Sequence, residues 1–345
     1  PPPPYEHVTA ADMEDFGPFY DFGEYEGRHY FLPIIGGSRY LTANLEIFEE
    51  RGATHLLPAA GDRLWTFAEF LAAARATTFD RDGDSETDVY GFAMPFQRNA
   101  PQQQQMPFFW GHGAFMFNPS GDTLTIDSDA GVRALQFMVD LEHEHGVMPP
   151  GSAGLRNSDV ADLWNQGRVA MRMGHHGTLV AHQRSLQTGA LASGIVELYP
   201  MMYPSLPGVD PHVFVVADSP CVFRQPDPEK RRLVIELAKF MTNTQHEREA
   251  AYALSTLPTR HSAADVWSDD PFQQYVLRVT RYGTRDAIQG YGIPLVEMTR
   301  AAFQAAMSRQ LTPRQALEDL TRRGNRFIAR DIERRRRVRL TGEAG

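Results

Sequence analysis

Cysteine and lysine are almost absent from this chain of 345 residues. The single cysteine, Cys221, excludes an internal disulfide and any CxxC metal pattern. Two lysines stand among 34 basic residues, and we interpret the excess of arginine as a bias of composition. No run approaches the roughly 18 apolar residues of a membrane-spanning helix, so the sequence predicts none.

Positive charge is also scarce overall, because the formal net charge is −9. A general nucleic-acid binder needs an excess of cations to displace counterions from phosphates, so we expect no nucleic-acid partner. The apolar share of 42% and the charged share of 22% are typical of a globular protein. The length is sufficient for two domains.

Familiar catalytic motifs are missing as well. The sequence contains no GxSxG, no P-loop, no HExxH and no GxGxxG. We therefore predict no catalytic residues, no resident metal and no cofactor. A sugar hydrolase stays open as a less favoured alternative, because paired carboxylates cannot be placed from sequence alone.

Helical patterns alternate with short apolar runs, which favours an α/β protein. We expect strands at residues 30–32, 89–94, 168–173, 213–216 and 221–223, with a chain break at Gly36 and Gly37. We expect helices at residues 41–50, 66–76, 128–145, 159–166, 228–241, 245–255, 271–278, 295–309 and 313–336. Thr66 and Glu69 have the spacing of a capping box at the start of the second helix.

Seven phrases follow one another in the order of a known protein family. They resemble its GKxYGLP, NKDLFEEAG, TWDEL, VYGFA, LFxxGKVAM, LPTR and LTPEEAL phrases, at residues 27–33, 44–52, 65–70, 89–93, 163–171, 257–260 and 311–317. The chain thus resembles the extracellular solute-binding proteins of sugar ABC importers, the maltodextrin-binding type.

The resemblance implies a two-lobed periplasmic-binding-protein-like fold of type II. It places residues 1–37 and 208–285 in the amino-terminal lobe, and residues 38–207 and 286–345 in the carboxy-terminal lobe. Only 26 residues precede the first phrase, so we expect the first lobe to be incomplete. The opening run Pro1 to Pro4 predicts a stiff, extended start and no signal peptide.

The function implied by the resemblance is reversible capture of a sugar or sugar-like solute in the cleft by hinge closure. The implied partner is the membrane permease of an importer, and the implied location is extracytoplasmic, as a monomer. A truncated or degenerate module without transport activity is the main alternative, because the segment before the first phrase is short.

Four candidate ligand contacts come from aromatic and histidine residues. Phe109 and Trp110 lie where the family's second lobe often lines its cleft, with simple core packing as the alternative. His175 and His176 occupy the turn that bears a stacking aromatic in the family, with a solvent-facing turn as the alternative. A metal site there would need a third ligand, such as His182 or His112.

Three further candidates follow from the phrases and their glycines. Arg39 follows Gly36 and Gly37, where the family's chain first crosses between lobes. Its guanidinium group can donate hydrogen bonds to hydroxyls or to a carboxylate. Arg260 ends the LPTR phrase, and Tyr291 lies between two glycines near the last helices. A surface ion pair is the alternative for Arg39.

Two charged segments are interpreted as solvated. The acids of residues 80–88 alternate like calcium ligands, but Gly83 stands at the fourth position, whereas an EF-hand loop has glycine at the sixth. The arginines at 334–337 and 339 are interpreted as a solvated helix end, with attraction to anionic lipid as the alternative.

Overall fold

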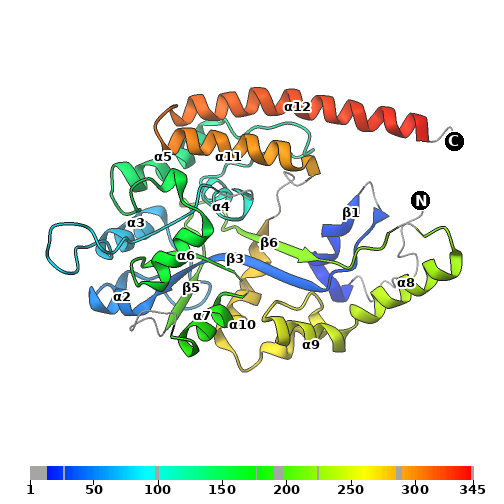
Figure 1. The fold of residues 1–345 in the computed structure, drawn as a ribbon, viewed down its shortest axis with the longest axis horizontal. Helices are drawn as coiled ribbons and strands as arrows, with labels where there is room; N and C mark the ends of the chain where they lie inside the picture. The colour runs from blue at the N-terminus through cyan, green and yellow to red at the C-terminus, as the bar shows by residue number, and fades with distance from the viewer. Residues whose placement is uncertain are drawn as a thin grey trace. The chain divides into compact units, whose positions relative to one another are not determined.

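The computed structural model describes residues 14–25, 28–97, 101–175, 177–189, 197–223, 225–284 and 290–342. Helices and short strands alternate through these residues, which confirms the α/β class (Figure 1). The strands are β1 Glu24–Tyr25, β2 Arg28–His29, β3 Ile35–Asn44, β4 Met171–His175, β5 Leu198–Met201, β6 Val213–Asp218 and β7 Gly283–Thr284. The α-helices are α2 Leu45–Glu50, α3 Phe67–Ala76, α4 Met106–Gly111, α5 Asp129–His143, α6 Asn157–Asn165, α7 Thr178–Gln187, α8 Pro228–Met241, α9 Thr244–Leu254, α10 Pro271–Val279, α11 Ile293–Met307 and α12 Pro313–Gly342. Short 3-10 helices are η1 Gly17–Gly23, η2 Thr54–Leu56, η3 Pro101–Gln103, η4 Ser152–Gly154, η5 His261–Trp267 and η6 Thr280–Tyr282.

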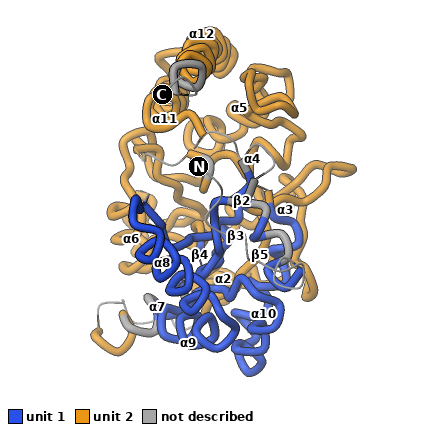
Figure 2. The backbone as a smooth tube through the Cα atoms, turned by 90° about the vertical axis from the view of Figure 1, so that its right-hand side faces the viewer, with its two compact units in different colours: residues 1–39, 174–184, 214–283 blue, residues 40–173, 185–213, 284–345 orange. Residues whose placement is uncertain are grey.

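The chain divides into two compact units (Figure 2). Unit 1 contains residues 1–39, 174–184 and 214–283, and unit 2 contains residues 40–173, 185–213 and 284–345. The chain passes from one unit to the other near residues 39, 213 and 283, close to the predicted lobe boundaries. Residues 174–184, which we predicted in the carboxy-terminal lobe, group with unit 1. That the units are the two lobes of the resemblance stays a prediction.

The strand β3 differs from the sequence prediction in two ways. It begins at Ile35 and runs through Gly36 and Gly37, which we expected to break the chain, and residues 30–32 form no strand. It also includes residues 41–44, which we expected to be helical. The reason lies in the pairing: the Gly36 amide and carbonyl both bond to Leu257, and a Cβ at Gly36 would lie 3.2 Å from the Leu257 carbonyl oxygen. Glycine therefore leaves room for the close backbone approach at this position, where a Cβ would be tight.

Each half of β3 has its own partner. In unit 1 its first half pairs antiparallel with β6, with Ile35 opposite Asp218 and Arg39 opposite Phe214. In unit 2 its second half pairs antiparallel with β5, with Leu41 opposite Met201. The apolar run predicted as a strand at residues 89–94 forms isolated bridges instead, and residues 221–223 form no strand.

The core of unit 2 is aromatic. Phe70 makes edge-on contacts with Trp65 and Phe92, at ring-centroid distances of 5.4 and 5.2 Å. Phe67 packs against Phe137 of α5 at 4.8 Å. The Trp65 indole donates a hydrogen bond to the Met202 carbonyl at 2.7 Å, so its polar atom is satisfied although the ring is buried.

Two helices near the end of the chain pack side by side in unit 2. Helix α11 contacts α12 and α5, and α12 also contacts α5 (Figure 1). At Gly324 of α12 a Cβ would lie 2.3 Å from a methyl carbon of Leu124, so the glycine leaves room for that side chain. Asn325 fixes the same region by accepting a hydrogen bond from the Leu124 amide at 2.7 Å. The hydrogen bonds between Asn325 and Leu124 thereby hold α12 against the segment that precedes α5.

A smaller core lies in unit 1. Phe16 and Tyr20 stack at 6.0 Å and pack with Leu32 and Ala238. Cys221 is exposed in the same unit. No helix among the described residues is long and apolar enough to cross a membrane.

Local signals set the helix ends. Ser128, Asp227, Asn243 and Asp270 each accept a hydrogen bond from a backbone amide of the first turn that follows. The Thr66–Glu69 capping box of α3 forms as predicted, with the Thr66 amide donating to Glu69 at 2.7 Å and the Glu69 amide donating to Thr66 at 3.2 Å. Capping side chains therefore mark where these helices begin.

Candidate functional site

Arg39 and His175 lie in unit 1, on strands β3 and β4. Arg39 is half-buried, and its guanidinium donates to the Ser38 carbonyl at 3.3 Å. His175 is also half-buried, at the turn before α7. Whether either side chain contacts a ligand stays a prediction.

The turn at His175 is closed by two local hydrogen bonds. The His175 amide donates to the Thr178 hydroxyl at 2.7 Å, and the Gly177 amide donates to His175 Nδ1 at 3.1 Å. In this bond the Nδ1 atom of His175 acts as an acceptor. His176 lies outside the described residues.

Arg260 is held inside unit 1 by several partners. Its side chain is 10% exposed and pairs with Asp15 at 3.0 Å. It donates to the Thr242 carbonyl at 2.6 Å, and its guanidinium carbon lies 4.0 Å from the centre of the Phe16 ring. These contacts give Arg260 a structural role in unit 1, and its contact with ligand stays a prediction.

Glu247 lies beside Arg260 with no exposed surface. Its carboxylate accepts hydrogen bonds from the Thr259 amide and hydroxyl and from the Arg260 amide, at 2.7 to 2.9 Å. Burial raises the pKa of Glu247 to about 7, against the opposing effect of these bonds and of Arg260. Asp15 shows the opposite balance: burial alone would raise its pKa, but hydrogen bonds from Ser262 and Arg260 lower it.

Phe109 and Trp110 lie on the short helix α4 of unit 2 and are buried, at 0% and 1% exposure. The Phe109 ring stacks on Phe303 of α11 at 5.2 Å, and the Trp110 ring lies 6.2 Å from that of His212. In this structure both rings pack in the core, the alternative that the sequence left open. Ligand contact through either ring stays a prediction and requires the ring to be uncovered.

Tyr291 borders a cavity of about 550 Å³ in unit 2, which we call the α12 pocket. Its hydroxyl donates to the Gly121 carbonyl at 2.6 Å, and its ring stacks on Phe117 at 5.6 Å. Burial raises the pKa of the Tyr291 phenol, so the group is neutral near pH 7. The pocket is lined by Gly290, Tyr291, Gly292, Pro294, Phe327, Arg330, Asp331, Arg334 and Arg335.

We interpreted the arginines at 334–337 as a solvated helix end, and Arg334, Arg336 and Arg337 are exposed in the structure. The sequence interpretation did not single out that residues 327, 330, 331, 334 and 335 have the spacing of one helical face, which lines this pocket. That spacing, together with an aromatic residue between glycines at 291, was the available signal.

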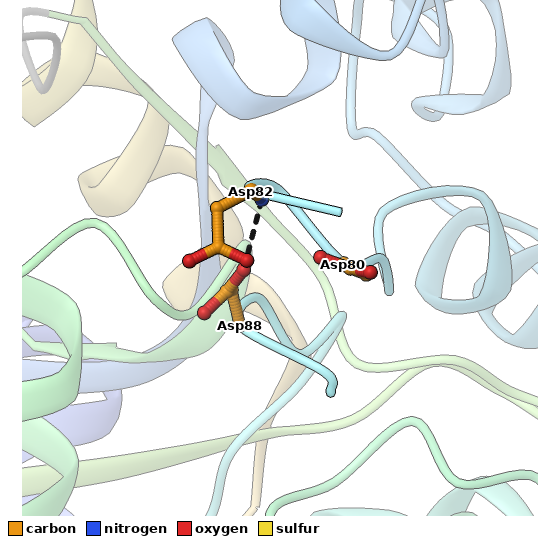
Figure 3. Close-up of side chains that lie close together, drawn as sticks. All are labelled: Asp80, Asp82 and Asp88. Carbon is orange, nitrogen blue, oxygen red and sulfur yellow. Dashed lines mark hydrogen bonds between the residues drawn. The ribbon is translucent and has the colours of Figure 1, made fainter. Parts of the chain in front are cut away.

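The acidic loop of unit 2 brings together oxygens of Asp80, Asp82 and Asp88 within 4.8 Å of one another (Figure 3). Asp80 accepts hydrogen bonds from the amides of Gly83 and Ser85 at 2.6 and 2.7 Å. The Asp82 amide donates to Asp88 at 3.3 Å (Figure 3). Backbone donors therefore occupy these carboxylates, which supports the interpretation as a solvated, self-closing loop. Hydrogen bonds from Ser85 and Gly83 lower the pKa of Asp80.

The sequence matches the family described as bacterial extracellular solute-binding proteins over residues 4–279. No curated protein matches the chain. Three solved structures resemble the chain at under 25% sequence identity, so they show its fold.

The cyclic α-maltosyl-1,6-maltose binding protein of Arthrobacter globiformis has a TM-score of 0.76 and 15% identity, over 95% of this chain and 79% of its own. Maltose-bound MalE3 of T. maritima has a TM-score of 0.71 and 20% identity, over 92% and 79%. UgpB of Mycobacterium tuberculosis in complex with glycerophosphocholine has a TM-score of 0.71 and 16% identity, over 93% and 76%. The two-lobed periplasmic solute-binding fold predicted from the sequence is thereby confirmed.

Proposed function

Because the chain belongs to the family of bacterial extracellular solute-binding proteins, we propose that it is the substrate-binding component of an ABC importer. The family match over residues 4–279 is the observation that carries this proposal. The proposed ligand is a carbohydrate or a similar small polar solute.

Three similar structures support that ligand class. One has maltose bound, and another is named for binding cyclic α-maltosyl-1,6-maltose. The third is a complex with glycerophosphocholine. All three ligands are small and rich in oxygen acceptors or hydroxyl groups. Sites for such molecules combine apolar or aromatic surfaces with a few polar groups at fixed positions.

The proposed mechanism is capture by hinge closure, followed by delivery to a membrane permease. A solute shifts a protein toward its closed state when it makes more favourable contacts in that state than in the open one. Capture and release need no bond chemistry. We therefore propose that the chain is not an enzyme, and the family consists of binding proteins.

The proposed ligand contacts are the residues that the sequence resemblance indicates. Arg39, His175 and Arg260 belong to unit 1, whereas Phe109, Trp110 and Tyr291 belong to unit 2. His176 joins them on the sequence resemblance alone. Arginine guanidinium groups and an imidazole N–H can donate hydrogen bonds to sugar hydroxyl oxygens. Aromatic rings can stack on the apolar faces of sugars. We further propose an extracytoplasmic location and a monomeric state.

A thermal-shift titration tests the proposal. The purified chain is heated with maltose, maltotriose, ribitol or glycerophosphocholine at increasing concentration. Binding to the folded state raises the melting temperature by mass action, so at least one solute should give a concentration-dependent increase. Light scattering on the same sample tests the monomer.

Arg39→Gln tests a predicted contact, with Arg232→Gln as its control. Arg232 is an exposed arginine of unit 1 that pairs with Glu229, so both variants remove one positive charge from that unit. We expect Arg39→Gln to weaken the solute response at least tenfold and Arg232→Gln to leave it unchanged.

Three outcomes would contradict the proposal. No shift with any solute, together with elution as an oligomer, would favour a truncated or degenerate module. Release of glycosidic products over hours would favour a hydrolase. Equal responses of Arg39→Gln, Arg232→Gln and the unmodified chain would remove Arg39 from the ligand site while leaving solute capture in place.

A further inference from the structure

The α12 pocket is built from two short stretches of unit 2. Residues 290–294 form one side, and the other is one face of α12, which presents Phe327, Arg330, Asp331, Arg334 and Arg335. The spacing of three and four residues places these five side chains in one column of the helix. A volume of about 550 Å³ falls in the range of small-molecule sites.

The pocket carries a surplus of positive charge. Three arginines line it against a single carboxylate, that of Asp331. Asp331 is 5% exposed, and it pairs with Arg334 at 2.5 Å and with Arg335 at 2.6 Å. This carboxylate therefore holds two guanidinium groups in place while neutralising only one of the three charges.

Arg330 has the freest guanidinium of the three. It is exposed, and among the described residues it has no hydrogen bond and no ion pair. Arg334 is 74% exposed despite its pairing with Asp331. Both side chains lie one turn apart on α12, so their donors can reach one shared acceptor.

Aromatic surface completes the pocket. Tyr291 is anchored by its hydrogen bond to Gly121 and by stacking on Phe117. The Arg335 guanidinium lies 5.6 Å from the centre of the Tyr291 ring and also donates to the Gly290 carbonyl. A rigid ring with a cation beside it suits a molecule that has both an anionic group and an organic part.

Positive charge gathers on α12 although the whole chain is acidic. Residues 313–342 contain ten arginines and four acidic residues, whereas the chain has a net charge of −9. Such a local positive field attracts anions and raises their association rate. Gly292 and Pro294, at the start of α11, also line the pocket, and the helix dipole there adds to the attraction.

We propose that the α12 pocket binds a small organic phosphate. The phosphate lies between Arg330 and Arg334, and the organic part lies against Tyr291 and Phe327. Phosphate is favoured over a single carboxylate, because its three terminal oxygens can accept from two arginine forks at once. Asp331 acts as a positioning residue for Arg334 and Arg335. The inference goes beyond solute capture, and it assigns Tyr291, which was proposed above as a solute contact, to the phosphate site of the α12 pocket instead.

Isothermal titration calorimetry at low salt tests this site with glucose 6-phosphate, glucose and inorganic phosphate. The double variant Arg330→Gln/Arg334→Gln removes two pocket charges and leaves Asp331 paired with Arg335. The control Arg326→Gln/Arg336→Gln removes two exposed charges of the same helix that do not line the pocket. Circular dichroism and melting temperature verify that both doubles are folded.

We expect glucose 6-phosphate and inorganic phosphate to bind the unmodified chain, with affinities that fall as salt rises. The variant Arg330→Gln/Arg334→Gln should lose at least tenfold in affinity for both phosphates. The control variant Arg326→Gln/Arg336→Gln should lose less than twofold. Glucose should show no difference between the pocket double and the unmodified chain.

The proposal is overturned if neither phosphate binds at millimolar concentration, or if both doubles lose affinity equally. Binding to vesicles of phosphatidic acid and phosphatidylcholine, without binding of soluble phosphates, would instead indicate a lipid-facing surface. A thermal shift with neutral solutes that persists in any of these cases would show that solute capture stands and that the phosphate site alone has failed.

Discussion

The carboxyl group of Glu247 lies in unit 1 with no exposed surface, beside the Arg260 side chain. Three donors surround its two oxygens, yet burial raises its pKa from the ordinary 4.5 to about 7. The proton is therefore bound more tightly in the folded chain than in the unfolded one. This side chain consequently links the stability of unit 1 to pH.

The sign of that linkage defines a prediction. Between pH 4.5 and about 7 the folded chain holds a proton on Glu247 that the unfolded chain has released. The contribution of Glu247 to the free energy of unfolding is therefore greatest below pH 4.5, and it is lost as the pH rises to about 7. The full change is on the order of 3 kcal/mol. Urea denaturation at pH 5 and pH 7.5 should show a smaller difference in unfolding free energy for Glu247→Gln than for the unmodified chain.

Glu249→Gln serves as the control, because Glu249 is an exposed acid of the same helix. A pH difference that is the same in Glu247→Gln as in the unmodified chain would contradict the raised pKa.

Single residues of the candidate site were harder to predict than their motifs. Arg260 was chosen from the LPTR phrase, but its partner Asp15 lies 245 positions earlier in the chain. Trp110 was chosen because it lies where the family's second lobe often lines its cleft, and only the packing of α4 shows that it is 1% exposed. Local sequence specifies residue type and helical face, whereas burial and ion pairing depend on distant segments.

At the scale of elements, the capping box of α3 gives a direct test. Thr66→Ala removes the acceptor of the Glu69 amide and should lower the unfolding free energy by about 1 kcal/mol. Thr66→Ser retains that oxygen and should lie within about 0.5 kcal/mol of the unmodified chain. Chemical denaturation of the three proteins measures both values. Equal losses in the two variants would indicate that the methyl group, and not the hydrogen bond, is responsible.

The contact between α3 and the segment at Gly91 gives a second element-scale prediction. A Cβ at Gly91 would lie 2.0 Å from the Ala74 carbonyl oxygen, and a backbone atom cannot move aside as a side chain can. Gly91→Ala should therefore destabilise the chain by at least about 3 kcal/mol or prevent folding.

Gly154→Ala is the matched control for this glycine, since nothing lies within 4 Å of a Cβ at that position. Its unfolding free energy should stay within about 1 kcal/mol of that of the unmodified chain, as for other strain-free glycine replacements. Similar stabilities of the two variants in a urea titration would mean that the contact at Ala74 relaxes.

Helices were predicted more accurately than strands, for a physical reason. A helix such as α5 or α8 carries its own capping residue and its own periodicity. The strand β3 depends on partners at Leu198–Met201 and Val213–Asp218, far along the chain, and its glycines looked like a break. The sequence also left open which phrases form continuous strands, and residues 89–94 form only bridges.

At the scale of the whole molecule, solute capture predicts a gain in stability. A solute that binds only the folded chain should raise the unfolding free energy by about 2.7 kcal/mol at a hundred times its dissociation constant. Urea denaturation with and without the solute identified by thermal shift measures this gain. A gain well below that value at saturation would mean that the unfolded chain also binds the solute.

The order of the seven phrases predicted the fold of the whole molecule better than any single element did. Each phrase is short, but their common order over most of the chain agrees with the family match at residues 4–279. The lobe boundaries remain a prediction, because compactness groups residues 174–184 with unit 1. Ligand identity requires distances between polar groups, and sequence order does not contain them.

The exposed thiol of Cys221 has a practical consequence for work on this protein. It is the only cysteine in the sequence, and it follows β6 in unit 1. A maleimide fluorophore would therefore attach at a single atom, with no need to remove other thiols by mutagenesis. The labelled chain offers a homogeneous optical sensor, in which a change in dye emission on adding a sugar or a phosphate would report each binding event in real time.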